Sequence, residues 1–312
     1  MSHHAPAAPA IYGKLLATAL FWGGTWIAGR VAVREASPLA VASWRFCIAA
    51  LVLGALVVAH EGRPRWSRRQ WLTVTALGAS GIFLYNICFL YGLRLIEAGR
   101  GALVVALTPA VVAAADWLLF GAPMSAKKGF GIGLAMLGCL LVVTNGDLGR
   151  LAGGDVGSGE WLIVGCVVLW AAYTFISRRG TRELSALAMT FGASLTGWAM
   201  LTVAALLDGS LFALADTGWR GWSSIVFLGL LGTAVAFTWY SDAVHRVGAT
   251  RAAAFINLVP VCAVLLGALL LGERLGTAVL AGGALVIAGV LLTNRAGRQT
   301  AAGREISRKT IT

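Results

Sequence analysis

Charged side chains are scarce in this sequence. Asp, Glu, Lys and Arg make up 12% of the 312 residues, about half the charged fraction of a typical soluble domain. Hydrophobic residues make up 58%, and mean hydropathy is +0.81. So little charge excludes a soluble globular protein. The apolar runs are long enough to supply the roughly 20 helical residues that cross a bilayer, which indicates an integral membrane protein embedded in phospholipid.

Histidine is also scarce, and catalytic motifs are missing. Four His occur, and the sequence contains no HExxH, GxSxG or P-loop motif. An intramembrane hydrolase needs a nucleophile–base pair or a metal, and the sequence shows neither. The cysteines all lie within apolar runs, where Cys behaves as a small apolar residue: Cys47, Cys88, Cys139, Cys166 and Cys262. We therefore expect no enzymatic activity, no disulfide, no metal and no cofactor.

Ten apolar runs predict an all-α membrane protein with ten transmembrane helices. They leave no room for a separate soluble domain. The first run follows directly on residues 1–10 and is too long for a signal-peptide core, so we expect it to be retained as a span. The predicted spans cover residues 11–34, 38–60, 70–93, 98–121, 126–145, 159–179, 184–207, 217–244, 249–271 and 276–295.

The two halves of the chain repeat each other at a spacing of about 150 residues, and such a repeat decides the architecture. At an offset of 148, identical residues begin with Trp22 and Trp170 and continue through Arg30, Arg34, Glu35, Ser37, Leu39 and Ala40. At an offset of 151, the matching residues of the first half are Trp71, Leu77, Gly78, Gly81, Ala98, Arg100, Leu107, Pro109 and Gly121.

Each copy holds five spans, an odd number, so the second copy enters the membrane from the opposite side. The sequence therefore predicts two inverted five-helix repeats, an architecture found in many secondary transporters. We assign residues 11–145 to the first repeat, 146–158 to a linker, 159–295 to the second repeat and 296–312 to a basic cytoplasmic tail.

Basic residues are distributed unequally between the two sides of the membrane. With a cytoplasmic N-terminus, 17 Lys and Arg lie inside and 7 outside, and Arg45 lies within a span. This excess predicts that both termini are cytoplasmic. Topology and lipid headgroups thus account for the net charge of +12, and we expect no nucleic-acid partner.

Motifs in both copies resemble the EamA-type repeats of the drug/metabolite transporter superfamily, in its ten-span branch. The first copy carries Phe21-Trp22-Gly23-Gly24, Ser37-Pro38 followed by Arg45, and Leu107-Thr108-Pro109. The second carries Leu258-Val259-Pro260, Leu271-Gly272-Glu273-Arg274, Gly282-Gly283 and Ile287-Ala288-Gly289-Val290. The resemblance covers nearly the whole chain and implies a carrier. Within the branch it is nearest to bacterial inner-membrane exporters of amino acids, aromatic ones included.

The two copies also differ at positions that bear charge. The first copy has Ala122 where the second has Glu273, and the second has Ala193 where the first has Arg45. The halves have therefore diverged, and an asymmetric substrate site is expected.

Deep aromatic and hydroxyl side chains are candidates for lining a site near the membrane midplane. Trp22 lies about 16 Å into span 1 at 1.5 Å per residue, which is too deep for an interface belt. Trp170 lies at the same depth in span 6. Such rings either fill helix crossings or line an amphipathic cavity for substrate. The candidates beside them at this level are Thr25, Trp26, Tyr173 and Thr174.

Tyr85 and Asn86 in span 3 and Asn257 in span 9 are further deep polar side chains, and a polar group in hydrocarbon needs partners. Asn257 either satisfies the carbonyl that Pro260 frees or faces substrate. Arg45, about 10 Å into span 2, either snorkels to the interface or attracts a substrate carboxylate.

Pro109 and Pro260 predict bends in spans 4 and 9, and we assign them as hinges. Asp116 and Asp242, near the cytoplasmic ends of spans 4 and 8, are candidates for proton coupling, although their carboxylates can also reach lipid headgroups.

The function that fits these features best is secondary export of amino acids or similar small metabolites by alternating access. A lipophilic-cation efflux pump would want a carboxylate in span 1, which has none before Glu35. A nucleotide-sugar carrier would favour several deep Lys or Arg, and only Arg45 is available. A scaffold or receptor needs neither midplane polar residues nor repeat symmetry. The sequence leaves open the exact substrate, proton coupling and the oligomeric state, a monomer included.

Overall fold

The computed structural model describes residues 9–147, 149, 156–180, 183–214 and 217–310. Within these residues, ten helical segments are long and apolar enough to cross a membrane, which confirms the predicted fold class. Six spans are single helices: α1 (Pro9–Glu35), α2 (Pro38–Glu61), α7 (Ala126–Thr144), α9 (Ser158–Gly180), α10 (Ala186–Leu207) and α15 (Thr277–Thr310).

The remaining four spans are composite. Span 3 consists of α3 (Arg68–Leu77), the π-helix η1 (Gly78–Leu84) and α4 (Tyr85–Leu95), and span 8 consists of α11 (Trp219–Gly229), η2 (Leu230–Val235) and α12 (Ala236–Val247). Span 4 is divided into α5 (Ala98–Val105) and α6 (Thr108–Phe120), and span 9 into α13 (Ala249–Ile256) and α14 (Val259–Leu271). The same spans are therefore irregular in both repeats.

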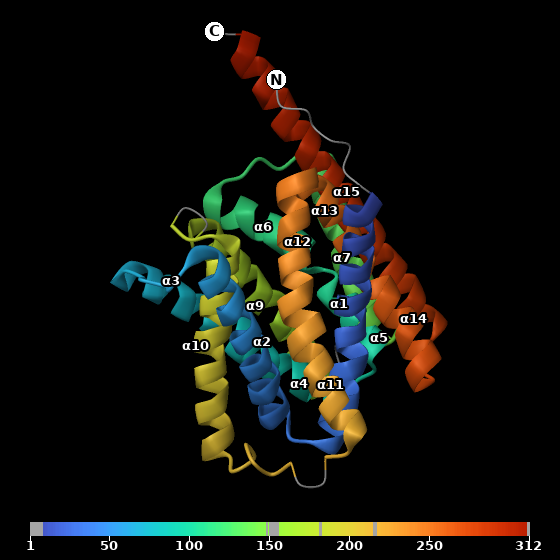
Figure 1. Ribbon diagram of the computed structural model, residues 1–312. Helices are drawn as coiled ribbons and strands as arrows, with labels where there is room; N and C mark the ends of the chain where they lie inside the picture. Colours follow the sequence, from blue (N-terminus) through green and yellow to red (C-terminus); the bar gives the residue numbers. More distant parts are fainter. Residues whose placement is uncertain (1–8, 148, 150–155, 181–182, 215–216, 311–312) are drawn as a thin grey trace.

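Both described ends of the chain lie at the same end of the molecule. Helix α1 begins there, and α15 runs past the predicted end of span 10 and projects beyond the body (Figure 1). We call this end the terminal end and the opposite one the far end. Arg150, Arg182 and residues 150–155 of the predicted linker lie outside the described residues.

The inverted repeat is visible in matching contacts between the halves. A Cβ added to Gly78 of η1 would lie 2.9 Å from the carbonyl oxygen of Ala193 in α10. A Cβ added to Gly229, at the end of α11, would lie 2.5 Å from the carbonyl oxygen of Arg45 in α2. The glycines correspond at an offset of 151 and their partners at 148, so one contact occurs twice. The glycines let spans 3 and 8 approach span 7 and span 2, respectively, closely.

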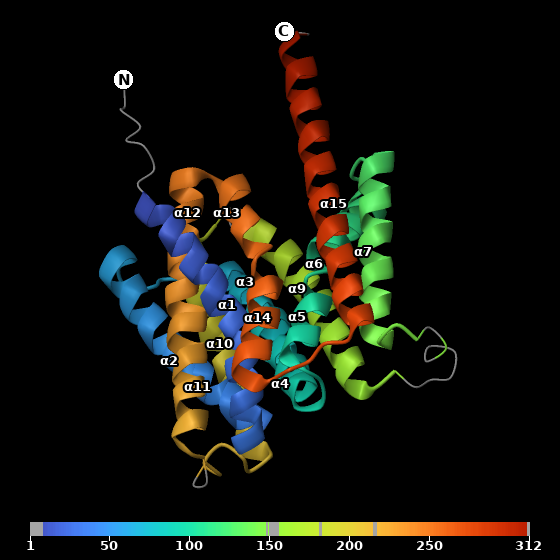
Figure 2. The same ribbon diagram turned by 90° about the vertical axis from the view of Figure 1, so that its right-hand side faces the viewer.

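Spans 5 and 10 form a close helix pair at one edge of the molecule, where α7 and α15 lie side by side (Figure 2). Gly131 faces Gly289, and Gly138 faces Gly282. At all four glycines an added Cβ would come within 2.8 Å of a backbone oxygen of the partner helix. Small residues that allow such backbone contact are typical of helix packing in membranes.

Spans 4 and 9 are interrupted just before Pro109 and Pro260. The residues between α5 and α6 and between α13 and α14 are turns. Because proline lacks an N–H and its ring crowds the preceding turn, a regular helix cannot pass through these positions. The breaks lie where the two prolines predict them.

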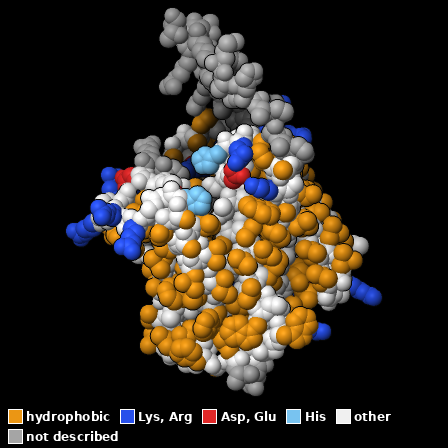
Figure 3. All heavy atoms as spheres, in the orientation of Figure 1, with side chains coloured by type: hydrophobic (Ala, Val, Ile, Leu, Met, Phe, Trp, Pro, Cys, Tyr) orange, Lys and Arg blue, Asp and Glu red, His pale blue; other side chains and the backbone are white. Residues whose placement is uncertain are grey.

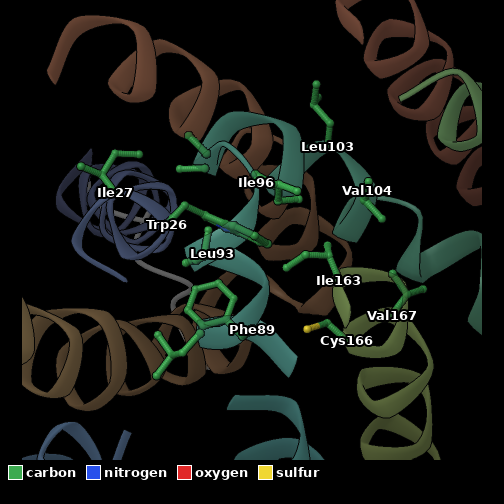
Figure 4. Close-up of a cluster of buried hydrophobic side chains, with 14 of the residues drawn as sticks. Trp26, Ile27, Phe89, Leu93, Ile96, Leu103, Val104, Ile163, Cys166 and Val167 are labelled. Atoms are coloured by element: carbon green, nitrogen blue, oxygen red, sulfur yellow. The ribbon is translucent and has the colours of Figure 1, made fainter. Parts of the chain in front are cut away.

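The apolar core lies where α1, α4, α5 and α9 meet (Figure 4). Trp26 of α1 stands edge-on to Phe89 of α4, with ring centroids 4.9 Å apart. Ile163 and Val167 of α9 belong to the same cluster, so both repeats contribute to it. The outer surface is mostly hydrophobic as well, and Lys and Arg gather mainly towards the terminal end (Figure 3). That distribution suits a protein surrounded by lipid.

Candidate functional site

Arg45 lies inside the helix bundle and bonds to both repeats. It is 9% exposed, and its Nη1 donates a hydrogen bond to Oδ1 of Asn86 in α4 at 2.9 Å. Its Nη2 donates to Oγ1 of Thr233 in η2 at 3.3 Å. The ring centroid of Phe46 lies 4.8 Å from the guanidinium carbon. The side chain therefore reaches into the interior and does not snorkel to an interface.

Asn86 and Thr233 are themselves fixed by bonds to their own helices. Nδ2 of Asn86 donates to the carbonyl of Ile82 in η1 at 2.7 Å, and Oγ1 of Thr233 donates to the carbonyl of Leu228 at 2.9 Å. With their protons used in this way, both side chains present an oxygen to Arg45. The π segments η1 and η2 thus position the two acceptors, and π segments are frequent at functional sites.

Five aromatic rings form a continuous row through spans 1, 3 and 6. Trp26 contacts Phe89, and Phe89 stacks on Tyr85 with centroids 5.9 Å apart. Tyr85 contacts Trp170 at 5.3 Å, and Trp170 stacks on Tyr173 at 5.0 Å. The row passes from one repeat into the other. Arg45 lies close enough to Tyr85 for the two side chains to interact electrostatically, so the row lies next to the hydrogen bonds of Arg45.

Tyr173 of α9 and Thr25 of α1 pack against corresponding glycines of the two π segments. A Cβ added to Gly81 of η1 would lie 2.2 Å from the ring of Tyr173, and one added to Gly232 of η2 would lie 2.5 Å from Cγ2 of Thr25. Gly81 and Gly232 correspond at 151, and Thr25 and Tyr173 at 148. Because these glycines have no side chain, span 6 can pack closely on η1 and span 1 can pack closely on η2.

Trp22 belongs to a second aromatic group. Its ring contacts Phe237 and Tyr240 of α12, both at 5.4 Å between centroids. Within the described residues no ring contact joins Trp22 to Trp170, so equal depth in the two repeats does not bring these rings together. Trp22 and Tyr240 instead help to line a narrow crevice that is too tight to hold a water molecule, together with Leu15, Thr18, Ala19, Phe255 and Ile256.

The two predicted hydroxyl groups bond to their own helices. Oγ1 of Thr25 donates to the carbonyl of Trp22 at 2.6 Å, and Oγ1 of Thr174 donates to that of Trp170 at 2.8 Å. Asn257 stands half-buried at the break between α13 and α14, and its side chain forms no hydrogen bond within the described part of the chain. Repair of the kink at Pro260 is therefore not what holds Asn257 in place.

The two predicted proton-coupling carboxylates are paired at the terminal end. Asp116 accepts from Arg178 at 2.7 Å. Asp242 lies 3.3 Å from Lys14 and 2.7 Å from Arg246. All three pairs are partly exposed. In the described part of the chain, His, Cys, Asp and Glu form no group of three or more that could hold a metal ion.

A different set of ionised groups closes the far end. Glu273, in the connection between α14 and α15, accepts from the backbone N–H groups of Ala98 at 2.8 Å and Gly99 at 3.0 Å. Its carboxylate therefore sits at the N-terminus of α5, where negative charge is stabilised. It also lies 3.5 Å from Nε of Arg30 in α1.

Further contacts at the far end lie both within the first repeat and between the repeats. Within the first repeat, Arg30 donates to two carbonyls at the end of α4, and Arg100 donates to two at the end of α7, where a cation is stabilised by the helix. Arg100 also pairs with Glu160 of α9 at 2.9 Å. Glu35 of α1 accepts from the first backbone N–H groups of α11.

Sequence reasoning missed several of these groups. Thr233 is the central omission, although its position next to the repeated Gly232 was a usable signal. Phe89 and Tyr240 each belong to one of the two aromatic groups. Nothing in the sequence distinguishes them from other aromatic residues in apolar runs. The sequence indicates Arg30 and Arg100 only as members of the repeat and of the basic residues outside, because their carboxylate partners are distant in the chain.

The family model for the EamA-like transporter family matches residues 10–144 and 157–295, one match for each repeat. The chain belongs to the EamA-like transporter family. It is a multi-pass membrane transporter, and its ten spans form two inverted five-helix repeats.

Curated relatives match along most of this EamA-family chain. The uncharacterized transporter YyaM of Bacillus subtilis (strain 168) is 29% identical, with 90% of this chain and 92% of the relative covered. A probable terminal-alkyne amino-acid exporter of Streptantibioticus cattleyicolor is 26% identical, with 90% and 92% covered. The uncharacterized inner membrane transporter YedA of Escherichia coli (strain K12) is 27% identical, with 91% and 90% covered.

A crystal structure of a protein 20% identical in sequence shares the fold. Its TM-score is 0.63, and the alignment covers 91% of this chain and 98% of that one. At this identity the likeness concerns the fold alone.

Proposed function

We propose that this protein is a secondary exporter of amino acids, aromatic ones included, or of similar small metabolites. It works by alternating access between the two repeats in a bacterial inner membrane. The observation that carries the proposal is the row of aromatic rings that passes between the repeats beside the polar contacts of Asn86. An amphipathic solute needs both rings and hydrogen-bond partners. One relative of similar length is a probable amino-acid exporter, which supports the substrate class.

The substrate contacts that we propose fall into two groups. Tyr85, Asn86, Trp170 and Tyr173 form the central group, in which the rings stack on substrate. The second group lies towards the terminal end, where Trp22 borders the crevice: Trp22, Thr25, Thr174 and Asn257. Trp26 is also a proposed contact and belongs with the central rings, because it is buried against Phe89.

Movement between the two states is proposed to use the helix breaks. The chain can change direction at Pro109 and Pro260 without losing regular helix hydrogen bonds, because these are already interrupted. Asp116 and Asp242 are the proposed groups for proton coupling. Their ion pairs have to open before either carboxylate can take up a proton.

The unbalanced positive charge of Arg45 speaks against a lipophilic-cation efflux pump. A cation pump needs a carboxylate at the site, and in the described residues none pairs with Arg45. Arg45 is also a single cation, whereas a nucleotide-sugar carrier would be expected to hold its phosphates with several.

Uptake into proteoliposomes tests the proposed function. We expect a panel of labelled amino acids to show saturable transport, with aromatic amino acids competing among themselves. A pH gradient, imposed in half of the samples, reports whether transport is coupled to protons. The absence of transport for every amino acid in the panel would contradict the proposal.

The proposed orientation places both termini in the cytoplasm, as the charge distribution indicates. Single cysteines at Arg63, in the connection between α2 and α3, and at Asp208, after α10, lie at opposite ends of the molecule. An impermeant maleimide added to intact cells should label Asp208→Cys and not Arg63→Cys. The reverse pattern would invert the topology.

A further inference from the structure

Arg45 carries hydrogen-bonding capacity that the protein does not use. A guanidinium has five N–H donors, and two of them bond to Asn86 and Thr233. The Nε–H is buried and has no hydrogen-bond partner within the described residues. No ion pair in the described part of the chain includes Arg45. The group is therefore a buried cation whose direct hydrogen-bond partners are neutral oxygens.

Such a cation is costly inside a membrane protein. An ionised group away from water needs an opposite charge or a full set of hydrogen bonds to offset its lost hydration. Asn86, Thr233 and the ring of Phe46 offset part of this cost, and the free Nε–H leaves the rest. An anion that approaches this side of the guanidinium would complete its coordination.

Holding the repeats together does not require this charge. The matching contact in the other half has Ala193 in the place of Arg45, and there Gly78 of η1 packs against Thr196, Gly197 and the carbonyl of Ala193 in span 7. The two polar partners are also oriented to accept from a donor, because an N–H of Asn86 is bonded to Ile82 and the O–H of Thr233 to Leu228. The two halves thus differ by one positive charge, which lies in span 2 at Arg45 and has no counterpart at Ala193 in span 7.

We propose that Arg45 binds the carboxylate of the transported substrate, and that the protein selects monocarboxylates with an apolar or aromatic body. The planar fork of a guanidinium matches the two oxygens of a carboxylate. The aromatic row that begins at Tyr85, next to Asn86, holds the body of the substrate. This inference rests on the proposed function and narrows its substrate class. Because Asn86 of α4 and Thr233 of η2 belong to different repeats, a carboxylate bound by Arg45 is linked to both repeats through the hydrogen bonds of Arg45.

Competition against labelled phenylalanine in proteoliposomes tests whether the protein recognises the carboxylate of its substrate. For the wild-type protein we expect phenylalanine and 3-phenylpropionate to compete, and phenylalaninamide and phenethylamine to compete roughly 10- to 100-fold more weakly, the loss expected for a hydrogen-bonded charge. In Arg45→Gln the preference for the acid over its amide should shrink to about twofold or less. Arg45→Lys, which keeps the charge without the fork, should fall between the two.

Arg220→Gln is the matched control, because it removes one positive charge from an exposed position at the far end and should keep the wild-type preference. Equal competition by acid and amide in the wild-type protein overturns the inference, and so does an unchanged preference in Arg45→Gln. The wild-type comparison decides even if Arg45→Gln does not fold.

Thermal stability of the purified protein separates this inference from the proposed function. Stabilisation by 3-phenylpropionate but not by phenylalaninamide, weakened in Arg45→Lys and lost in Arg45→Gln, supports the carboxylate site whether or not amino acids are transported. Absence of amino-acid transport together with that stabilisation contradicts the proposed function alone. Equal stabilisation by the acid and the amide contradicts the inference.

Discussion

The two ends of the molecule are held together by polar contacts of different kinds. At the far end, the side chains of Arg30 and Glu273 are 15% and 7% exposed, and those of Arg100 and Glu160 are 11% and 7% exposed. Each pair also bonds to the ends of helices, and each joins the first repeat to the second. The far end is therefore closed by buried charges that lie on both sides of the boundary between the repeats.

At the terminal end the ion pairs lie in or near solvent. The side chains of Arg178 and Asp116 are 50% and 24% exposed, and those of Lys14 and Asp242 are 39% and 29% exposed. Exposed pairs contribute about 0–1 kcal/mol, whereas removing one partner of a buried pair costs about 3–5 kcal/mol. The comparison teaches that the far end is held by the stronger polar contacts. In the proposed alternating access, opening the far end is therefore the costly step.

Among the substitutions considered, removing the charge of Glu273 should weaken the contacts of the far end most. In Glu273→Gln, Arg30 loses its carboxylate and α5 loses a charged cap, so the far end opens more often. We expect the maleimide labelling rate of Ile96→Cys, which is buried at the far end, to rise roughly tenfold or more, since 1.4 kcal/mol corresponds to a factor of ten.

The control for this prediction changes the neighbouring residue. Arg274→Gln alters one exposed charge beside Glu273 and should leave the labelling of Ile96→Cys unchanged. If Glu273→Gln labels at the rate of Arg274→Gln, the buried contacts do not hold the far end closed.

Substitution of Trp170 tests whether the site between the two ends controls substrate affinity. Trp170→Ala removes ring contacts with Tyr85 and Tyr173, and stacking is worth about 0.5–1.5 kcal/mol beyond buried area. We expect aromatic substrates to bind several-fold more weakly. Trp222→Ala, at the far end, should change transport little. Equal activity of the two variants at matched expression would mean that Trp170 serves packing only.

Spans 4 and 9 run between the two ends of the molecule. Substitution of the prolines at their breaks should have a moderate effect on the transport rate. We expect Pro260→Ala to leave expression largely intact and to change turnover about two- to fivefold, because a restored helix N–H adds a hydrogen bond of about 1 kcal/mol to one state. Transport rates at saturating substrate provide the measurement. Wild-type rates in both Pro109→Ala and Pro260→Ala would show that the hinges are irrelevant.

Neutralising Asp242 should have the smallest effect on stability, because its ion pairs are exposed. We expect Asp242→Asn to shift the Tm by only a few degrees, while its uptake no longer responds to a pH gradient if Asp242 carries the coupled proton. Asp116→Asn provides the parallel measurement for the other carboxylate. Full pH-gradient stimulation in both variants would remove both residues from proton coupling.

The sequence was sufficient for the parts of the fold that depend on local composition. The spans followed from the length of apolar runs, and the breaks in spans 4 and 9 followed from Pro109 and Pro260. The inverted architecture followed from the odd number of spans in each repeat. The depth of Arg45 in span 2 left two alternatives, snorkelling to the interface or a place in the interior, and only the structure decided between them.

Side-chain partners could not be predicted in the same way. Trp22 and Trp170 have equal depth and equal places in the repeat, yet the first contacts Tyr240 and the second contacts Tyr85. The π segment that ends just before Asn86 and the one that carries Thr233 have no reliable sequence pattern, although their glycines repeat. Helix depth fixes a height in the membrane, but the direction of a side chain around the helix depends on which neighbour lies there.

The sequence by itself determined that this protein spans a membrane ten times in two inverted repeats, because apolar length, proline and chain periodicity act locally. The tertiary structure alone decided which charges meet. It paired Glu273 with Arg30 across the repeats and left Arg45 between Asn86 and Thr233 with no anion among the described residues. Electrostatic partners are chosen by helix packing, which brings together residues more than a hundred positions apart and excludes the water that would otherwise screen them.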